Sequence, residues 1–191
     1  MGSILRQAFE SHRSMFEALL ESQAGAIERI GRRIVETLAG GGKILSFGNG
    51  GSAADAQHLV CELVGRFEGD RPGLAAIALS TNTSTLTAVG NDFGFNQVFA
   101  RQIEALARPG DLCLGISTSG NSMNVVLALR CARAMGVATA GLAGGNGGRM
   151  RPCCDDIVIV PQQRTCRIQE AHLFCVHVWC AMVDAETTKR K

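Results

Sequence analysis

Apolar positions in the first forty residues recur at helical spacing, and the pattern then changes to short apolar runs that alternate with helical stretches. The helical spacing extends from Phe9 to Leu38 and stops at the glycines of AGGGK, which are typical of a helix end. Five runs that are apolar along their whole length follow, at residues 43–48, 75–80, 111–117, 137–143 and 156–161. Such strands occur in parallel sheets that are covered on both faces.

This alternation predicts an α/β fold, a three-layer α-β-α sandwich with a five-stranded parallel sheet of the flavodoxin type and an N-terminal helical extension. The predicted helices are residues 52–66, 83–89, 94–107, 122–135, 147–153 and 164–186. We expect a helical segment over residues 1–40 and the sheet-containing part over residues 41–191, within a single structural domain, because 191 residues is an ordinary size for one.

Composition and charge narrow the class of protein. Nineteen basic and seventeen acidic residues give a net charge of +2, and the chain has no tyrosine, so nucleic-acid binding gets little support. No apolar run approaches the roughly 18 to 20 residues of a membrane span, and the first residues lack the apolar stretch of a signal peptide. We therefore expect a cytoplasmic protein that binds neither membrane nor nucleic acid. Its eight cysteines lie mostly in apolar segments, where they act as small hydrophobic residues.

Two strand-to-helix junctions are rich in glycine, serine and asparagine. They are SFGNGGSAAD at residues 46–55 and GISTSGNSMN at residues 115–124. Because the carboxyl ends of parallel strands meet at one edge of a sheet, we expect both loops to face one crevice. The first loop formally matches the G-x-G-x-x-A dinucleotide fingerprint, but the next strand ends in ALSTNTS, without the acid that binds a ribose. The nucleotide interpretation is therefore rejected.

The two loops favour a small phosphate ester as the ligand. Glycines let the backbone approach a ligand, and free N–H groups at a helix start attract an anion. The alternative is that Ser52 and Ser122 are simple N-caps, with Ser52 and Asp55 forming a capping box. For either serine alone the two interpretations are equally supported. The presence of two such loops in one crevice favours the anion site.

Polar residues also occur within two apolar helices. His58 and Glu62 are four residues apart, so they project from one face of the helix that follows the first loop. Two of the four histidines, His172 and His177, lie in the apolar last helix, where polar side chains need partners. We interpret His172 as a hydrogen-bonded core residue. The spacing alone leaves His177 open between a structural and a functional role.

At this point the motifs resemble the phosphoheptose isomerases, which are sugar isomerase (SIS) domain proteins. The matching motifs are GNGGSAADAQH, CEL, GRF, TAVGNDFGF, GISTSGNS and RIQEAH, in this order between Gly42 and Val183. The resemblance implies an SIS domain over residues 41–191 and an enediolate reaction that converts sedoheptulose 7-phosphate to D-glycero-D-manno-heptose 7-phosphate. This is the first step toward the ADP- or GDP-heptose of the cell envelope. It also implies a homotetramer with sites between subunits, in which residues 1–40 pack.

The resemblance further implies the residues of the site. Glu62 and His177 would be the catalytic acid–base pair, and one zinc ion per subunit would be bound by His58, Glu62, Gln169 and His177. The substrate-binding residues would be Asn49, Gly50, Gly51, Ser52, Glu62, Asn91, Asp92, Ser117, Thr118, Ser119, Ser122 and Gln169. Gln169 and His177 lie about 12 Å apart along an ideal helix, whereas the donors on one zinc ion lie about 3 to 4 Å apart. We therefore expect the metal site to depend on the oligomer and to be incompletely occupied.

The competing hypothesis is a non-catalytic protein of the same fold that binds a sugar phosphate or a replication-initiator partner. Such a relative lacks the glutamate and the histidine that this chain has at Glu62 and His177, which favours the enzyme. The chain departs from the family pattern at Cys166, where some members have an acid or an alanine. The resemblance therefore supports no carboxylate role there.

Overall fold

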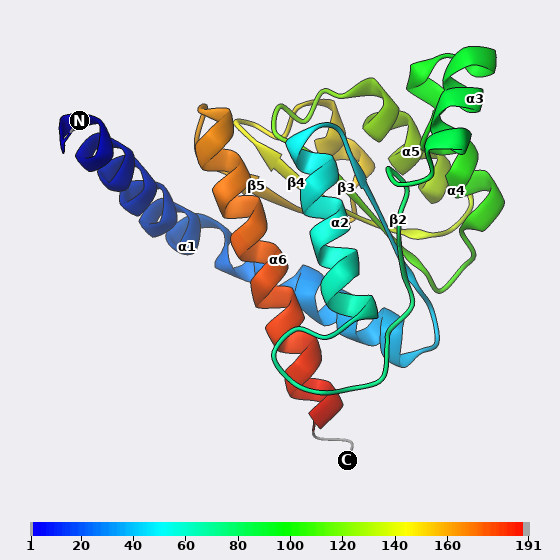
Figure 1. Ribbon diagram of the computed structural model, residues 1–191, viewed down its shortest axis with the longest axis horizontal. Helices are drawn as coiled ribbons and strands as arrows, with labels where there is room; N and C mark the ends of the chain where they lie inside the picture. The colour runs from blue at the N-terminus through cyan, green and yellow to red at the C-terminus, as the bar shows by residue number, and fades with distance from the viewer. Residues whose placement is uncertain (1, 189–191) are drawn as a thin grey trace.

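In the computed structural model, which describes residues 2–188, a five-stranded parallel sheet lies between two layers of helices (Figure 1). The strands are β1 (Ile44–Gly48), β2 (Ala76–Ala78), β3 (Leu112–Ser117), β4 (Ala138–Gly144) and β5 (Asp156–Val160). Their order is β2-β1-β3-β4-β5, and every neighbouring pair is parallel. The predicted α-β-α sandwich is confirmed.

The helices follow the predicted order, with three differences, the first being that α3 extends four residues beyond the predicted end at residue 89. They are α1 (Gly2–Ala39), α2 (Gly51–Val64), α3 (Thr83–Phe93), α4 (Ala100–Leu106), α5 (Met123–Ala134) and α6 (Thr165–Thr188), with the 3₁₀ helices η1 (Phe95–Gln97) and η2 (Gly148–Cys153). The predicted helix 94–107 is split into η1 and α4, and Gly94 ends α3 with a φ of 83°. The predicted helix 147–153 is a 3₁₀ helix that contains Pro152, which lacks the N–H an α-helix needs.

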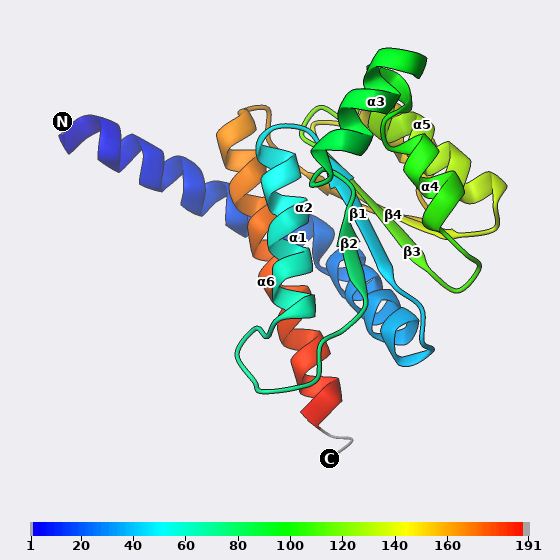
Figure 2. The ribbon, with the colours of Figure 1, turned by 45° about the vertical axis from the view of Figure 1, so that its right-hand side comes forward.

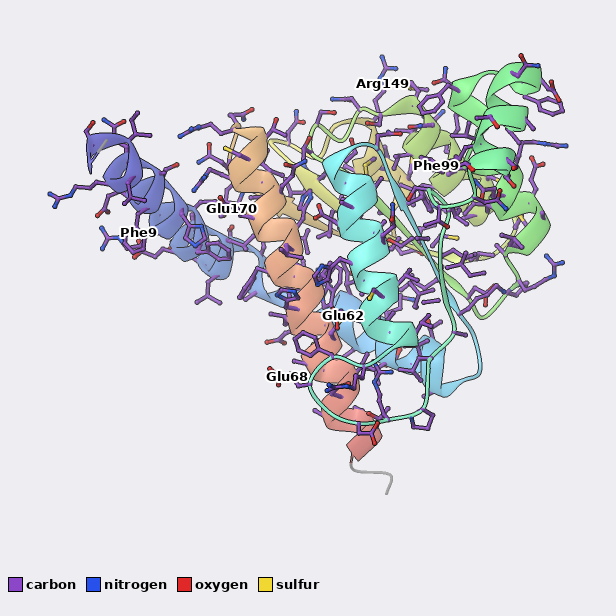
Figure 3. All side chains as sticks on the ribbon, in the orientation of Figure 1. Phe9, Glu62, Glu68, Phe99, Arg149 and Glu170 are labelled. Carbon is purple, nitrogen blue, oxygen red and sulfur yellow. The ribbon has the colours of Figure 1, made fainter. Side chains whose placement is uncertain are left out.

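Helix α1 is one continuous helix whose first half projects from the body of the molecule (Figure 1, Figure 2). Phe9, in the projecting half, is 61% exposed, and His12 lies 2.8 Å from Glu170 of α6 (Figure 3). From Met15 onward, α1 contributes to the hydrophobic core that α6 shares. The packing of residues 1–40 in an oligomer stays a prediction.

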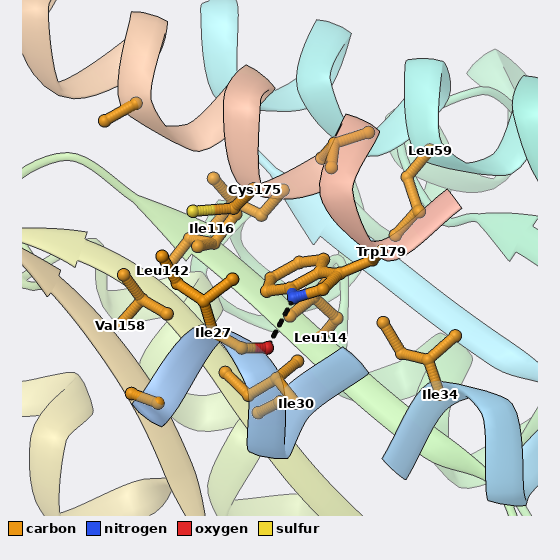
Figure 4. Packing of buried hydrophobic residues seen from close by; sticks show 14 of the residues in the cluster. Ile27, Ile30, Ile34, Leu59, Leu114, Ile116, Leu142, Val158, Cys175 and Trp179 are labelled. Carbon is orange, nitrogen blue, oxygen red and sulfur yellow. Dashed lines mark hydrogen bonds between the residues drawn. The ribbon is translucent and has the colours of Figure 1, made fainter. Parts of the chain in front are cut away.

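Trp179 of α6 is at the centre of the core that α1, α2 and α6 form on one face of the sheet (Figure 4). It is fully buried, and its Nε1–H donates to the carbonyl of Ile27 at 2.9 Å. Gly31 gives the room for this contact, since a Cβ there would collide with Trp179 and Met182. On the other face, α4 and α5 pack around Phe99 and Leu129. Within residues 2–188, no helix is long and apolar enough to cross a membrane.

His172 is fully buried in α6, as the apolar sequence predicts. The expected hydrogen bond is not formed, because neither ring nitrogen has a hydrogen-bond partner within the described residues. Burial lowers the pKa of His172 to about 4 from 6.5, and the backbone of Ala143 opposes this only in part. The folded protein therefore holds this ring neutral where the unfolded chain would bind a proton.

The stability of the protein should consequently fall as the pH drops. The contribution of His172 is fully present above pH 6.5 and is lost between pH 6.5 and about 4, because the unfolded state binds the proton more readily there. The free energy of unfolding should fall by about 3 kcal/mol over this pH range. Urea unfolding of the wild type and of His172→Leu at several pH values measures it. Parallel pH dependences for the two proteins would contradict this prediction.

Candidate active site

The two glycine-serine loops meet at the carboxyl ends of β1 and β3. Gly48 pairs with Ile116 in the parallel register, so the two strands end level with each other. The chain continues from β1 to β2 on one side and from β3 to β4 on the other, which makes this the topological switch point of the sheet. Asn49 and Asn124 exchange two side-chain hydrogen bonds of 2.9 and 2.8 Å across the loops. The two loops are therefore in contact, and that both face one crevice stays a prediction.

The N-cap interpretation is wrong for Ser52, whereas Ser122 does occupy the N-cap position of α5. Gly50 is the N-cap of α2, with a φ of 54° that favours glycine. As a glycine it has no side chain that could cap the helix. The helix therefore begins at Gly51, and Ser52 is buried in its first turn. Ser122 stands at the N-cap of α5 without a cap hydrogen bond, and its Oγ lies 3.0 Å from Ser117 Oγ. The hydroxyls of this pair bond to each other rather than to the helix end.

A polar cavity of about 460 Å³ opens between the second loop, the end of β4 and the start of α6. Its polar side chains are Thr118, Ser119, Asn121, Asn146, Gln163 and Thr165. The sequence analysis proposed Thr118 and Ser119, placed Asn121 in the second loop without assigning it a role, and missed Asn146, Gln163 and Thr165. The available signal was their position directly after the predicted fourth and fifth strands, at the same sheet edge as the two loops.

Helices α2 and α6 bring three of the predicted residues together. His177 Nε2 lies 3.1 Å from His58 Nε2, and His58 Nε2 lies 3.4 Å from Glu62 Oε1. The side chains of His58 and Glu62 are 39% and 20% exposed, so solvent and small ligands can reach them. Glu62 lies on the side of α2 that faces α6 (Figure 3). A carboxylate and two imidazoles at this spacing can transfer protons.

The structure separates the other predicted residues from this cluster. The amide of Gln169 lies against Gly51, where a Cβ would collide with it, at the opposite end of α2 from Glu62. Asn91 and Asp92 are exposed at the end of α3, and Asn91 Nδ2 donates to Asp92 Oδ1 at 2.8 Å. Helix α3 stands at the margin of the molecule, away from α6, in both views (Figure 1, Figure 2).

The chemistry of the cluster suits a zinc ion, but its arrangement is incomplete. Imidazole nitrogens and carboxylate oxygens are usual zinc ligands, and donors on one ion lie about 3 to 4 Å apart. The distances of 3.1 Å from His58 to His177 and 3.4 Å from His58 to Glu62 fall in this range. Within residues 2–188, however, no group of three or more His, Cys, Asp or Glu side chains is arranged to hold a metal ion as it stands. A shared ion therefore requires side-chain rotation and a fourth donor.

Asp55 is a further polar residue on α2, which the sequence analysis assigned only to a capping box. Its Oδ2 is buried and has no hydrogen-bond partner within the described residues. Burial raises the pKa of its carboxyl to about 6, and the nearby His58 opposes this shift. Asp55 precedes Glu62 by seven residues, which places the two on the same helix face. That spacing was the signal available in the sequence.

Comparisons with known proteins agree with the fold. The SIS domain family model matches residues 8–144. The phosphoheptose isomerase of Aliarcobacter butzleri is 50% identical over 186 residues, which are 97% of this chain and 98% of the relative. That of Paramagnetospirillum magneticum is 56% identical over 158 residues, which are 83% and 82% of the two chains.

The solved structure of phosphoheptose isomerase from Neisseria gonorrhoeae is similar to this chain with a TM-score of 0.91 and 38% identity, over 96% of this chain and 98% of that one. Such identity over almost the full length of both chains extends the likeness beyond the shared fold. The relatives named phosphoheptose isomerase make this protein an isomerase. The chain therefore belongs to the SIS domain family and, within it, to the phosphoheptose isomerases.

Proposed function

We propose that the protein interconverts sedoheptulose 7-phosphate and D-glycero-D-manno-heptose 7-phosphate by proton transfer through Glu62 and His177. The convergence of His58, Glu62 and His177 between α2 and α6 carries the proposal. The phosphoheptose isomerases among its relatives support the substrate class. A non-catalytic protein would have no need of an acid and a base at this spacing in a solvent-accessible place.

The reaction moves the carbonyl of the sugar from C2 to C1. Glu62 removes a proton from C1, which leaves an enediolate, and returns the proton to C2. His177 takes the proton from the oxygen on C1 and supplies one to the oxygen on C2, so that no proton is gained or lost overall. His58, 3.1 Å from His177, holds the imidazole of His177 toward α2.

The two loops hold the substrate. Free N–H groups and hydroxyls at the start of α5 suit the phosphate. The glycines at the start of α2 let the sugar approach the backbone. The residues proposed to line this site are Asn49, Gly50, Gly51, Ser52, Ser117, Thr118, Ser119, Ser122 and Gln169.

One zinc ion per subunit is part of the proposal, with His58, Glu62 and His177 as ligands. Gln169 is the proposed fourth ligand, and because it lies against Gly51, away from the other three, it would come from a neighbouring subunit. When bound, zinc would supply Lewis-acid polarisation to the sugar oxygens. Glutamine is an uncommon ligand beside the usual Cys, His, Asp and Glu, so incomplete occupancy is expected.

A second subunit completes the site in this proposal, within a homotetramer. Asn91 and Asp92 lie on α3 away from the proton-transfer pair, so they reach a substrate only at the site of a neighbouring copy. Phe93 and Phe95, which flank Gly94, are 55% and 62% exposed. Exposed aromatic rings beside functional polar groups are typical of a surface that another protein covers.

Replacing Glu62 by glutamine should reduce isomerisation by about 10²- to 10⁴-fold, because the carboxylate that moves the carbon-bound proton is lost. The assay is the conversion of sedoheptulose 7-phosphate to aldose, with circular dichroism to establish that the fold is intact. Glu68→Gln, the same change at an exposed position, is the matched control. Full activity in Glu62→Gln would refute the role of Glu62.

Replacing His58 by glutamine should remove most of the zinc from the purified protein, since His58 Nε2 lies near both of the other donors. Elemental analysis gives zinc per subunit without reference to activity. His12→Gln, which changes a histidine that pairs with Glu170, about two turns of α6 from His177, should leave the zinc content unchanged. Equal zinc in the two variants would argue against the metal site.

Co-expression of Glu62→Gln chains with Asp92→Ala chains should restore activity that neither variant has alone. If Glu62 and Asp92 of one site come from different subunits of a symmetric oligomer, random mixing leaves about a quarter of the sites intact. Mixing Glu62→Gln with His177→Gln is the control, because these two residues meet within one chain. Recovery in the control only, or in neither mixture, would contradict the shared site.

A further inference from the structure

The connection between α2 and β2, which we call the 65–75 loop, crosses over α6 before it enters the sheet (Figure 1, Figure 2). It leaves the end of α2 one turn after Glu62 and passes the helix that carries His177. On its return it is attached to α2 by a hydrogen bond from Leu74 N to the carbonyl of Leu63, at 3.0 Å. The loop therefore has contacts with both helices of the proton-transfer pair.

Phe67 of this loop packs on the imidazole of His177. The ring centroids are 5.6 Å apart and the planes meet at 33°. The ring of His58 lies 5.0 Å from that of His177. His177 is thus in contact with one ring from α2 and one from the 65–75 loop, which limits the orientations that its side chain can take. Phe67 is half-buried and also packs against the hydrophobic core, so its own position is fixed.

Arg71 attaches the same loop to both helices. Its Nη2 donates to the carbonyl of Glu62 at 2.6 Å and its Nη1 to the carbonyl of Leu63 at 2.8 Å. These carbonyls belong to the last turn of α2, where intrahelical donors are missing. Arg71 Nε donates to Asp184 Oδ1 of α6 at 2.9 Å, and the arginine side chain is only 2% exposed.

Asp184 completes the attachment from the side of α6. It lies seven residues after His177, close to the same face of the helix. Its Oδ2 accepts hydrogen bonds from the backbone N–H groups of Glu68 and Gly69, at 3.0 and 2.9 Å. One carboxylate thus holds the loop backbone and Arg71 together, next to Phe67.

We propose that Phe67 and Arg71 are positioning residues for the isomerase reaction. Phe67 fixes the imidazole of His177, and Arg71, paired with Asp184, fixes the end of α2 that carries Glu62 relative to α6. The inference rests on the proposed function, in which Glu62 and His177 transfer the protons. Displacement of a reacting group by about 1 Å can lower a rate about 10²-fold. The loops that hold the substrate are distant from this contact, so its loss should lower kcat and leave KM unchanged.

The test is steady-state kinetics with sedoheptulose 7-phosphate on the intact oligomer. Phe67→Leu should lower kcat about 10- to 100-fold with little change in KM, and Phe67→Tyr, which keeps the ring, should restore it. Phe174→Leu is the matched control, because Phe174 lies on α6 beside Phe16 and not beside His177. Arg71→Lys, which keeps the charge but loses the three-way donation, should show the same fall in kcat as Phe67→Leu.

The outcomes separate this inference from the function on which it rests. Activity retained in Glu62→Gln refutes the proposed function itself. An inactive Glu62→Gln together with a wild-type kcat in folded Phe67→Leu refutes the positioning role alone. If Phe67→Leu does not fold, Phe67→Met, which better keeps the side-chain volume, gives the same comparison. A fall in thermal stability without any fall in kcat indicates a purely structural contact and also overturns the inference.

Discussion

The packing of α6 against α1, α2 and the sheet is the contact on which the site depends. Trp179 is fully buried, and its hydrogen bond to Ile27 prevents α6 from turning about its axis. Positions two residues apart on a helix differ by about 200°. His177 therefore faces α2 because Trp179 faces α1. A rotation of α6 would separate His177 from His58 and would remove the proton-transfer cluster without unfolding the sheet.

The two ends of the contact between α2 and α6 are held by different means. At the start of α2, the missing side chain of Gly51 lets the amide of Gln169 approach closely. At its end, the buried pair of Arg71 and Asp184 joins the helices. Between these ends lie polar groups that an apolar contact would ordinarily exclude. Asp55, with an unpartnered buried oxygen, shows that this region is not arranged for stability alone.

Errors in the sequence analysis arose where a backbone conformation, rather than a pattern, decides the structure. The N-cap of α2 was assigned to Ser52 because the φ of 54° at Gly50 cannot be read from composition. The predicted helix 94–107 was too long because an apolar helical spacing continues through the break between η1 and α4. The edge strand β2, predicted over residues 75–80, has only three residues. Strands with neighbours on both sides were predicted to within one residue at each end.

The sequence by itself determined the parallel sheet, the position of both loops at one edge and the shared face of His58 and Glu62. Those features follow from strand and helix periodicity, which acts over a few residues. Only the tertiary structure decided that His177 lies opposite His58, 119 residues away, that Gln169 lies against Gly51 and that Phe67 covers His177. The rotation and level of one helix against another are set by the packing of side chains such as Trp179, and no local pattern encodes them.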